Sequence, residues 1–171
     1  MSEAIEYHAA RVLILLAAMA PRRGPLEGFT KLVKLDFLLR YPQFLGRLLA
    51  GSGERWPDGL EPNAAEQLAV DLPMIRYKYG PWDDRYYPIL GYLIGTGLAD
   101  VTKTRGTLTI RLTDSGRTVA RKLSDDPAWD VVARRANVLR QHFGKLSGNA
   151  IKDRIYRELP DVVDRPMRTP I

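Results

Sequence analysis

The chain has 171 residues, of which 45% are hydrophobic and 27% are charged, a composition typical of a globular domain with or without an extension. The absence of cysteine excludes disulfides, zinc–thiolate sites and cysteine nucleophiles; it fits a reducing compartment, and we expect a cytoplasmic protein. The net charge of +6 is unevenly spread, because residues 1–100 hold 11 Lys/Arg and 12 Asp/Glu whereas residues 101–171 hold 15 and 8. This asymmetry indicates either an acidic partner or a solvated basic surface.

The first predicted helix covers residues 4–20, where apolar side chains from Ile5 to Met19 recur on one face. Residues 12–20 form an apolar run ending in an Ala-x-Ala pattern, as a signal peptide does. The preceding residues are acidic rather than basic, however, and Pro21 would follow the cleavage point. Because the run is also too short to span a bilayer, we expect a buried helix and no membrane partner.

The next segments alternate between helices and irregular chain. Residues 29–41 form a helix that is apolar on most sides, which predicts that it lies between other elements. Pro42 ends that helix or starts a short one, and residues 64–70 form another short helix after a long loop. Residues 74–79 are predicted to be extended or irregular, and Gly80-Pro81 is predicted to form a turn.

The most informative pattern covers residues 83–123. It predicts a helix that reaches Thr96 and is started or bent by Pro88, then two strands joined at Arg105-Gly106, then a helix from Gly116 to Leu123. A helix followed by a hairpin and another helix is typical of a winged helix. We therefore expect a mainly α protein with a small β-hairpin, in which residues 1–123 form a winged helix-turn-helix core.

Residues 124–160 are predicted to form a C-terminal helical extension, and residues 161–171 a tail. Asp126-Pro127 is a strong helix start, and Ser147 caps a last helix that stops at Pro160. Between Trp129 and Phe143, apolar residues follow a 3-4-3-4 spacing and form a narrow seam. The seam is either a contact surface or a buried face, and we favour burial against the core.

No pattern in the sequence indicates catalysis. There is no phosphate-binding loop, dinucleotide fingerprint, nucleophile elbow, metalloprotease motif or calcium loop. The acidic pairs Asp83-Asp84 and Asp125-Asp126 stand where helices begin, and we interpret them as caps rather than metal ligands. We expect no enzyme activity, no cofactor and no metal.

Two candidate contact surfaces remain. The first is basic and could meet nucleic-acid phosphates; it comprises Arg22, Arg23, Lys103, Arg105 and Arg111. The helix before the hairpin lacks the Arg, Lys, Asn and Gln side chains that read base edges, and its first turn carries two aspartates.

The second surface is aromatic and basic, a composition found at the centres of protein interfaces. Its candidate residues are Arg76, Tyr77, Lys78, Tyr79, Trp82, Arg85, Tyr86 and Tyr87, together with Trp129. Packing in the core and stacking on single-stranded bases are the alternatives for these side chains.

Two segments resemble a known family. Residues 31–42 (KLVKLDFLLRYP) resemble the second-helix motif of the middle components of bacterial three-component ABC systems, and residues 74–83 (MIRYKYGPWD) resemble their Arg-Tyr-x-Tyr-Gly-Pro-Trp segment. Such components resemble the small subunit of Lamassu-type anti-phage defence systems. The resemblance implies a non-catalytic accessory subunit that bridges or restrains an SMC- or Rad50-like ATPase and an effector nuclease. The alternative is a winged-helix transcriptional regulator that binds DNA.

Overall fold

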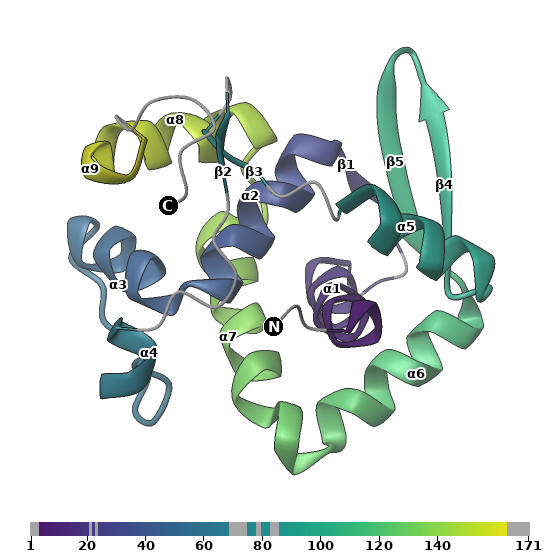
Figure 1. The fold of residues 1–171 in the computed structure, drawn as a ribbon, viewed down its shortest axis with the longest axis horizontal. Helices are drawn as coiled ribbons and strands as arrows, with labels where there is room; N and C mark the ends of the chain where they lie inside the picture. The colour runs from purple at the N-terminus through teal and green to yellow at the C-terminus, as the bar shows by residue number, and fades with distance from the viewer. Residues whose placement is uncertain are drawn as a thin grey trace.

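The computed structural model describes residues 4–20, 22, 24–68, 75–77, 80–82 and 86–163. The fold is mainly helical, with a small three-stranded antiparallel sheet and a separate two-stranded ribbon (Figure 1). The helices are α1 (Ile5–Met19), α2 (Phe29–Arg40), α3 (Pro42–Gly51), α4 (Ala64–Leu68), α5 (Tyr86–Gly95), α6 (Asp114–Asp125), the 3-10 turn η1 (Pro127–Trp129), α7 (Asp130–Phe143), α8 (Gly148–Glu158) and α9 (Pro160–Val163). The strands are β1 (Leu26–Glu27), β2 (Ile75–Tyr77), β3 (Gly80–Trp82), β4 (Ala99–Thr104) and β5 (Thr107–Leu112).

Helix α1 lies at the centre of the molecule. It contacts α5, α6 and α7, which surround it in Figure 1 together with α2. Residues 11–16 of α1 are all buried, as are residues 32–39 of α2. A helix covered on most sides must be apolar around most of its circumference, and this is why both helices carry apolar residues on most sides rather than in a single stripe. The predicted burial of these two helices is confirmed.

The three-stranded sheet has the order β1-β5-β4, so the short strand that precedes α2 pairs with the second strand of the hairpin. Its hairpin turn is Arg105-Gly106, as predicted, and both residues have positive φ angles of 52° and 82°. Two positive φ values are the requirement of a type I′ turn, whose twist matches that of the flanking strands.

The base of the hairpin is fixed to the helices on either side. Helix α5 ends in a Schellman motif, in which Leu98 N donates to Leu93 O at 2.8 Å and Gly97 adopts a φ of 74°. Thr113 caps α6 by accepting from Gly116 N at 3.0 Å, and its hydroxyl donates to Gly97 O at 2.6 Å. A Cβ at Gly116 would stand 1.9 Å from Leu98 O, so only glycine permits this approach.

A buried ionic network joins α1, α2 and α5. Arg11 donates from Nε and Nη2 to the two carboxylate oxygens of Asp36 at 2.7 and 2.9 Å, and its Nη1 lies 3.0 Å from Nδ1 of His8. The hydroxyl of Tyr86, the first residue of α5, donates to the same carboxylate. Burial alone would raise the pKa of Asp36, but the Arg11 charge and the hydrogen bonds from Arg11 and Tyr86 hold it below its usual range.

The predicted C-terminal extension packs directly on the core. Helix α7 contacts α1 and α2, and α8 contacts α2 and α3. Lys31 of α2 donates to Gly144 O at 2.8 Å, at the end of α7, and Arg154 of α8 donates to Leu48 O of α3. The described part of the chain therefore places residues 124–160 as part of the same packed body as the helices before them.

Two details differ from the sequence-based expectations, and a third decides between alternatives. Residues 161–163, predicted as the start of the tail, belong to α9, where Val162 is buried and Asp161 pairs with Arg47 at 2.6 Å; residues 164–171 lie outside the described residues. Gly80 and Pro81 are in β3, paired with β2, rather than in a turn. Of the two alternatives for Pro88, the structure has the one in which it lies inside the first turn of α5, which is tolerated because first-turn N–H groups have no intrahelical acceptor.

Replacing Asp36 tests the importance of the network. We expect Asp36→Asn to lower the free energy of unfolding by about 3–5 kcal/mol, because Arg11 would remain buried without its counter-charge. Asp130→Asn is the matched control: Asp130 pairs with Arg134 at 2.7 Å on the surface, and its loss should cost less than about 0.5 kcal/mol. Denaturant titration of both variants measures the difference, and equal stabilities would contradict this role of Asp36.

The same carboxylate gives the stability a defined pH dependence. Because the pKa of Asp36 is lowered in the folded state, its contribution is present above the ordinary aspartate value of about 3.9 and is lost as pH falls through the lower folded-state value. The wild-type chain should therefore lose stability more steeply than Asp36→Asn below about pH 4.

Candidate interaction surface

Helix α5 presents an uncharged face to solvent. Its inward face consists of Tyr86, Ile89, Leu90 and Leu93, all buried. Its outward face is exposed and is made of Tyr87, Pro88, Gly91, Ile94 and Gly95. The exposed fractions of Tyr87 and Ile94 are 62% and 48%, high for side chains of this size. We call this outward set the α5 face.

The exposed ring of Tyr87 is supported from below. It stacks on Phe29, the first residue of α2, with ring centroids 5.0 Å apart and an interplanar angle of 25°. Phe29 also meets Tyr86 edge-to-face, with centroids 6.4 Å apart. Stacking of this kind restricts the rotation of an exposed tyrosine, so Tyr87 forms a preordered aromatic contact point.

Tyr86 was predicted to contribute to a protein interface, and this prediction is wrong. Its side chain is 1% exposed and donates a hydrogen bond to Asp36. Burial and the negative charge of Asp36 raise its pKa, so the hydroxyl keeps the proton that it donates. The two adjacent tyrosines therefore have different roles, because successive residues of a helix point about 100° apart.

The other predicted aromatic and basic contacts are placed only in part. Arg76, Tyr77 and Trp82 lie in β2 and β3, of which only the backbone is described. Three further candidates, Lys78, Tyr79 and Arg85, lie outside the described residues.

The apolar seam from Trp129 to Phe143 faces the protein interior. Ala136, Leu139 and Phe143 are buried, in agreement with the favoured interpretation. Trp129 is half-buried and packs on Tyr7, with ring centroids 5.2 Å apart. Trp129 is therefore largely occupied by a contact within the chain.

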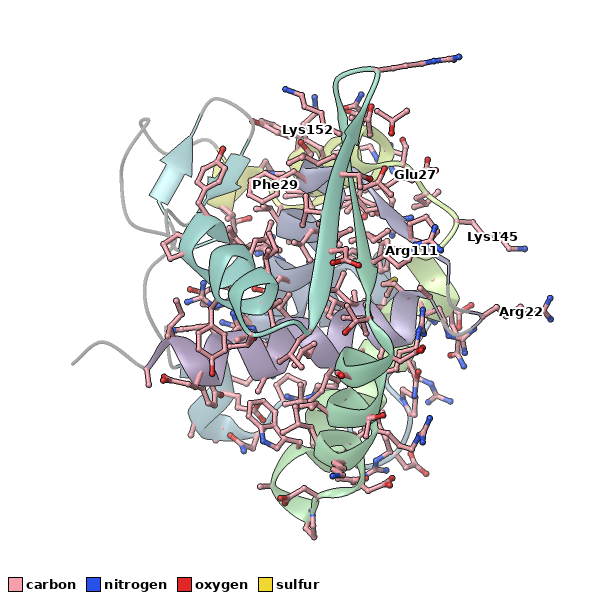
Figure 2. The ribbon with its side chains drawn as sticks, turned by 90° about the vertical axis from the view of Figure 1, so that its right-hand side faces the viewer. Arg22, Glu27, Phe29, Arg111, Lys145 and Lys152 are labelled. Carbon is pink, nitrogen blue, oxygen red and sulfur yellow. The ribbon has the colours of Figure 1, made fainter. Side chains whose placement is uncertain are left out.

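The predicted basic contacts are exposed and lie around the hairpin. Lys103 is close to the hairpin turn, Arg105 lies in the turn, and Arg111 lies on β5 opposite Asp100. Figure 2 shows Arg111 and Arg22 on one side of the hairpin, with α5 on the other side. Arg23 lies outside the described residues.

One lysine that the sequence did not single out belongs with these residues. Figure 2 shows Lys145 on the same side of the hairpin as Arg22 and Arg111. It belongs to the basic C-terminal part of the chain, which was the available signal, but only the packing of α7 and α8 on α2 places it on this side of the molecule. Glu27 and Asp100, the cross-strand neighbour of Arg111, interrupt this surface with negative charges. We call Arg22, Lys103, Arg105, Arg111 and Lys145 the basic side.

A second group of charged residues lines a cavity of about 250 Å³ next to the buried network. Arg11, Arg40, Glu66 and Arg135 contribute to its wall, together with Tyr7. Arg135 is 5% exposed; it pairs with Glu66 at 2.6 Å and donates to the carbonyl oxygens of residues 60 and 61. These bonds fasten the α3–α4 loop to α7.

The described residues contain no group of three or more His, Cys, Asp or Glu side chains that could hold a metal ion. None of the described helices combines the length and the apolar character needed to cross a membrane. No protein-family model, curated protein or solved structure matches the chain.

The position of α5 can be tested at its first residue. Tyr86→Phe should lower the free energy of unfolding by about 1–3 kcal/mol, because one hydrogen bond to a buried carboxylate is lost. Tyr92→Phe is the matched control in the same helix, since Tyr92 is half-buried, and it should change stability by less than about 0.5 kcal/mol. If thermal unfolding finds the two variants equally stable, the Tyr86 hydroxyl does not hold α5.

Proposed function

We propose that the chain is a non-catalytic accessory subunit of an SMC- or Rad50-like ATPase complex in anti-phage defence, and that it bridges or restrains the ATPase and an effector nuclease in the cytoplasm. The first support is the resemblance of residues 31–42 and 74–83 to the middle components of three-component ABC systems. The second support is the arrangement of the elements, which suits a docking protein.

That arrangement is compatible with a winged helix-turn-helix core. Helix α1, strand β1, helix α2, helix α5 and the β4–β5 hairpin follow one another in this order, and β1 pairs with the second hairpin strand. In this interpretation α5 occupies the position of a recognition helix and the hairpin is the wing. Helices α3 and α4 and the β2–β3 ribbon are insertions between α2 and α5.

The main support for a protein-binding role is the α5 face. A recognition helix that reads DNA needs side chains such as Arg, Lys, Asn or Gln that hydrogen-bond to base edges in the major groove. The described helix α5 has none of these residues and no charge, whereas it exposes Tyr87 and Ile94. An aromatic and aliphatic surface around small residues suits a protein partner, because large apolar side chains supply most of the binding energy in such interfaces.

The α5 face can be tested by co-expression with a candidate SMC- or Rad50-like ATPase from the genome that encodes this chain. Tyr87→Glu and Ile94→Glu should each abolish co-purification of the ATPase, because a carboxylate would be desolvated at the centre of the interface. Val131→Glu is the matched control, since Val131 is an apolar residue of α7 with 37% exposure. Retention of the ATPase by both α5 variants, or loss with the Val131 variant as well, would contradict the assignment.

A second contact is supported by the basic side. Exposed guanidinium and ammonium groups on a hairpin and its surroundings suit a phosphate backbone, which provides affinity without sequence information. We propose that the hairpin contacts DNA held by the complex. A stand-alone regulator is the competing function, and it requires sequence-dependent binding that the uncharged α5 face does not favour.

A mobility-shift assay at two salt concentrations separates these functions. We expect weak binding that decreases steeply with salt and does not depend on sequence. Arg105→Glu and Arg111→Glu should weaken it, whereas Arg55→Glu should not, because Arg55 lies in the loop between α3 and α4, away from the hairpin. Tight, sequence-dependent binding would favour the regulator.

A further inference from the structure

A groove of about 370 Å³ opens between α1, α6 and α7, away from the α5 face and the hairpin tip. Each helix contributes one row of residues to it. On α6 the row has the spacing i, i+3, i+4 and i+7 of a single helical face. The lining residues are Ile14, Ala17 and Ala18 from α1, Arg117, Ala120, Arg121 and Ser124 from α6, and Ala133 and Asn137 from α7.

Small side chains produce the hollow. Four alanines and one serine line the groove, and larger side chains at these positions would fill it. The partly exposed Ala17, Ala18 and Ala133 give it an apolar wall, beneath which Ile14 and Ala120 are buried. A groove of this kind has room for one large apolar side chain from outside.

The charge of the groove has one sign. Among the described residues that line it, Arg117 and Arg121 are charged and none is a carboxylate. Arg117 is held in place because its Nη1 donates to Ala20 O at the end of α1, at 3.2 Å. Arg121 is exposed and lies one turn further along α6. A ligand that places an apolar group on the floor therefore meets guanidinium groups at the wall, where a carboxylate would be favoured.

We propose that this groove binds an acidic peptide segment of a partner protein, with one large apolar side chain inserted between the helices and carboxylates paired with Arg117 and Arg121. A nucleic acid is disfavoured because none of the described lining residues offers an aromatic ring on which an inserted base could stack. The site is separate from the α5 face and does not depend on the proposed ATPase partner. It gives the chain a second protein-binding surface.

Selection from a displayed library of random 12-residue peptides on the full chain tests the proposal. Enriched peptides should combine Asp or Glu with one large apolar residue, and the strongest is then synthesised with a fluorescent label for anisotropy titration. Arg121→Glu should weaken its binding about tenfold or more, because a repulsive charge replaces an attractive one. Arg157→Glu, the same change on an exposed position of α8, should stay within about twofold.

A second variant tests the hollow itself. Ala133→Phe places a ring in the groove and should abolish peptide binding, while Ala128→Phe in the exposed η1 turn should leave it unchanged. Circular dichroism establishes that each variant is folded, and Arg121→Glu provides the test if Ala133→Phe is not. The proposal is overturned if no acidic peptide is enriched, or if the selected peptide binds Arg121→Glu as well as the wild type. The Arg121→Glu variant should still co-purify with the ATPase, because the groove is separate from the α5 face. That measurement tests the proposed function independently of peptide binding.

Discussion

The bidentate pair between Arg11 and Asp36 is the interaction on which the arrangement of the helices depends. It joins the two most deeply buried helices, α1 and α2. The Asp36 carboxylate also accepts a hydrogen bond from the hydroxyl of Tyr86, the first residue of α5. Two apolar helices can slide against each other at little cost, whereas a buried ion pair is favourable only in one geometry. The pair therefore fixes the register of α1 and α2. Through the Tyr86 hydrogen bond it also fixes the position of α5 relative to these two helices.

Sequence patterns predicted the local elements well. The apolar character of α1 and α2, the Arg105-Gly106 turn and the Ser147 cap are signals between near neighbours in the chain, and all are present. The ionic network was not predicted, because Asp36 is 25 residues from Arg11 and 50 from Tyr86. In the sequence, Asp36 is a charged residue in a largely apolar helix, and no neighbouring residue indicates which side chains it pairs with.

The candidate surfaces were predicted in part for the same reason. Composition identified the aromatic and basic segments, but it could not separate Tyr86, which is buried, from Tyr87, which is exposed, because that depends on which residue starts α5. Lys145 joins the basic side only through the fold of the last helices. The groove between α1, α6 and α7 depends on alanines that, in sequence, look like ordinary helix formers.

The central position of α1 has a consequence for synthesis on the ribosome. Helix α1 is made about a hundred residues before α6 and α7, which cover it. Asp36 of α2 becomes available to Arg11 much sooner, but until α7 has been made the sides of α1 that face α6 and α7 have no native cover. Termination of synthesis before α7 would therefore release a fragment with exposed apolar surface, prone to aggregate or to engage chaperones.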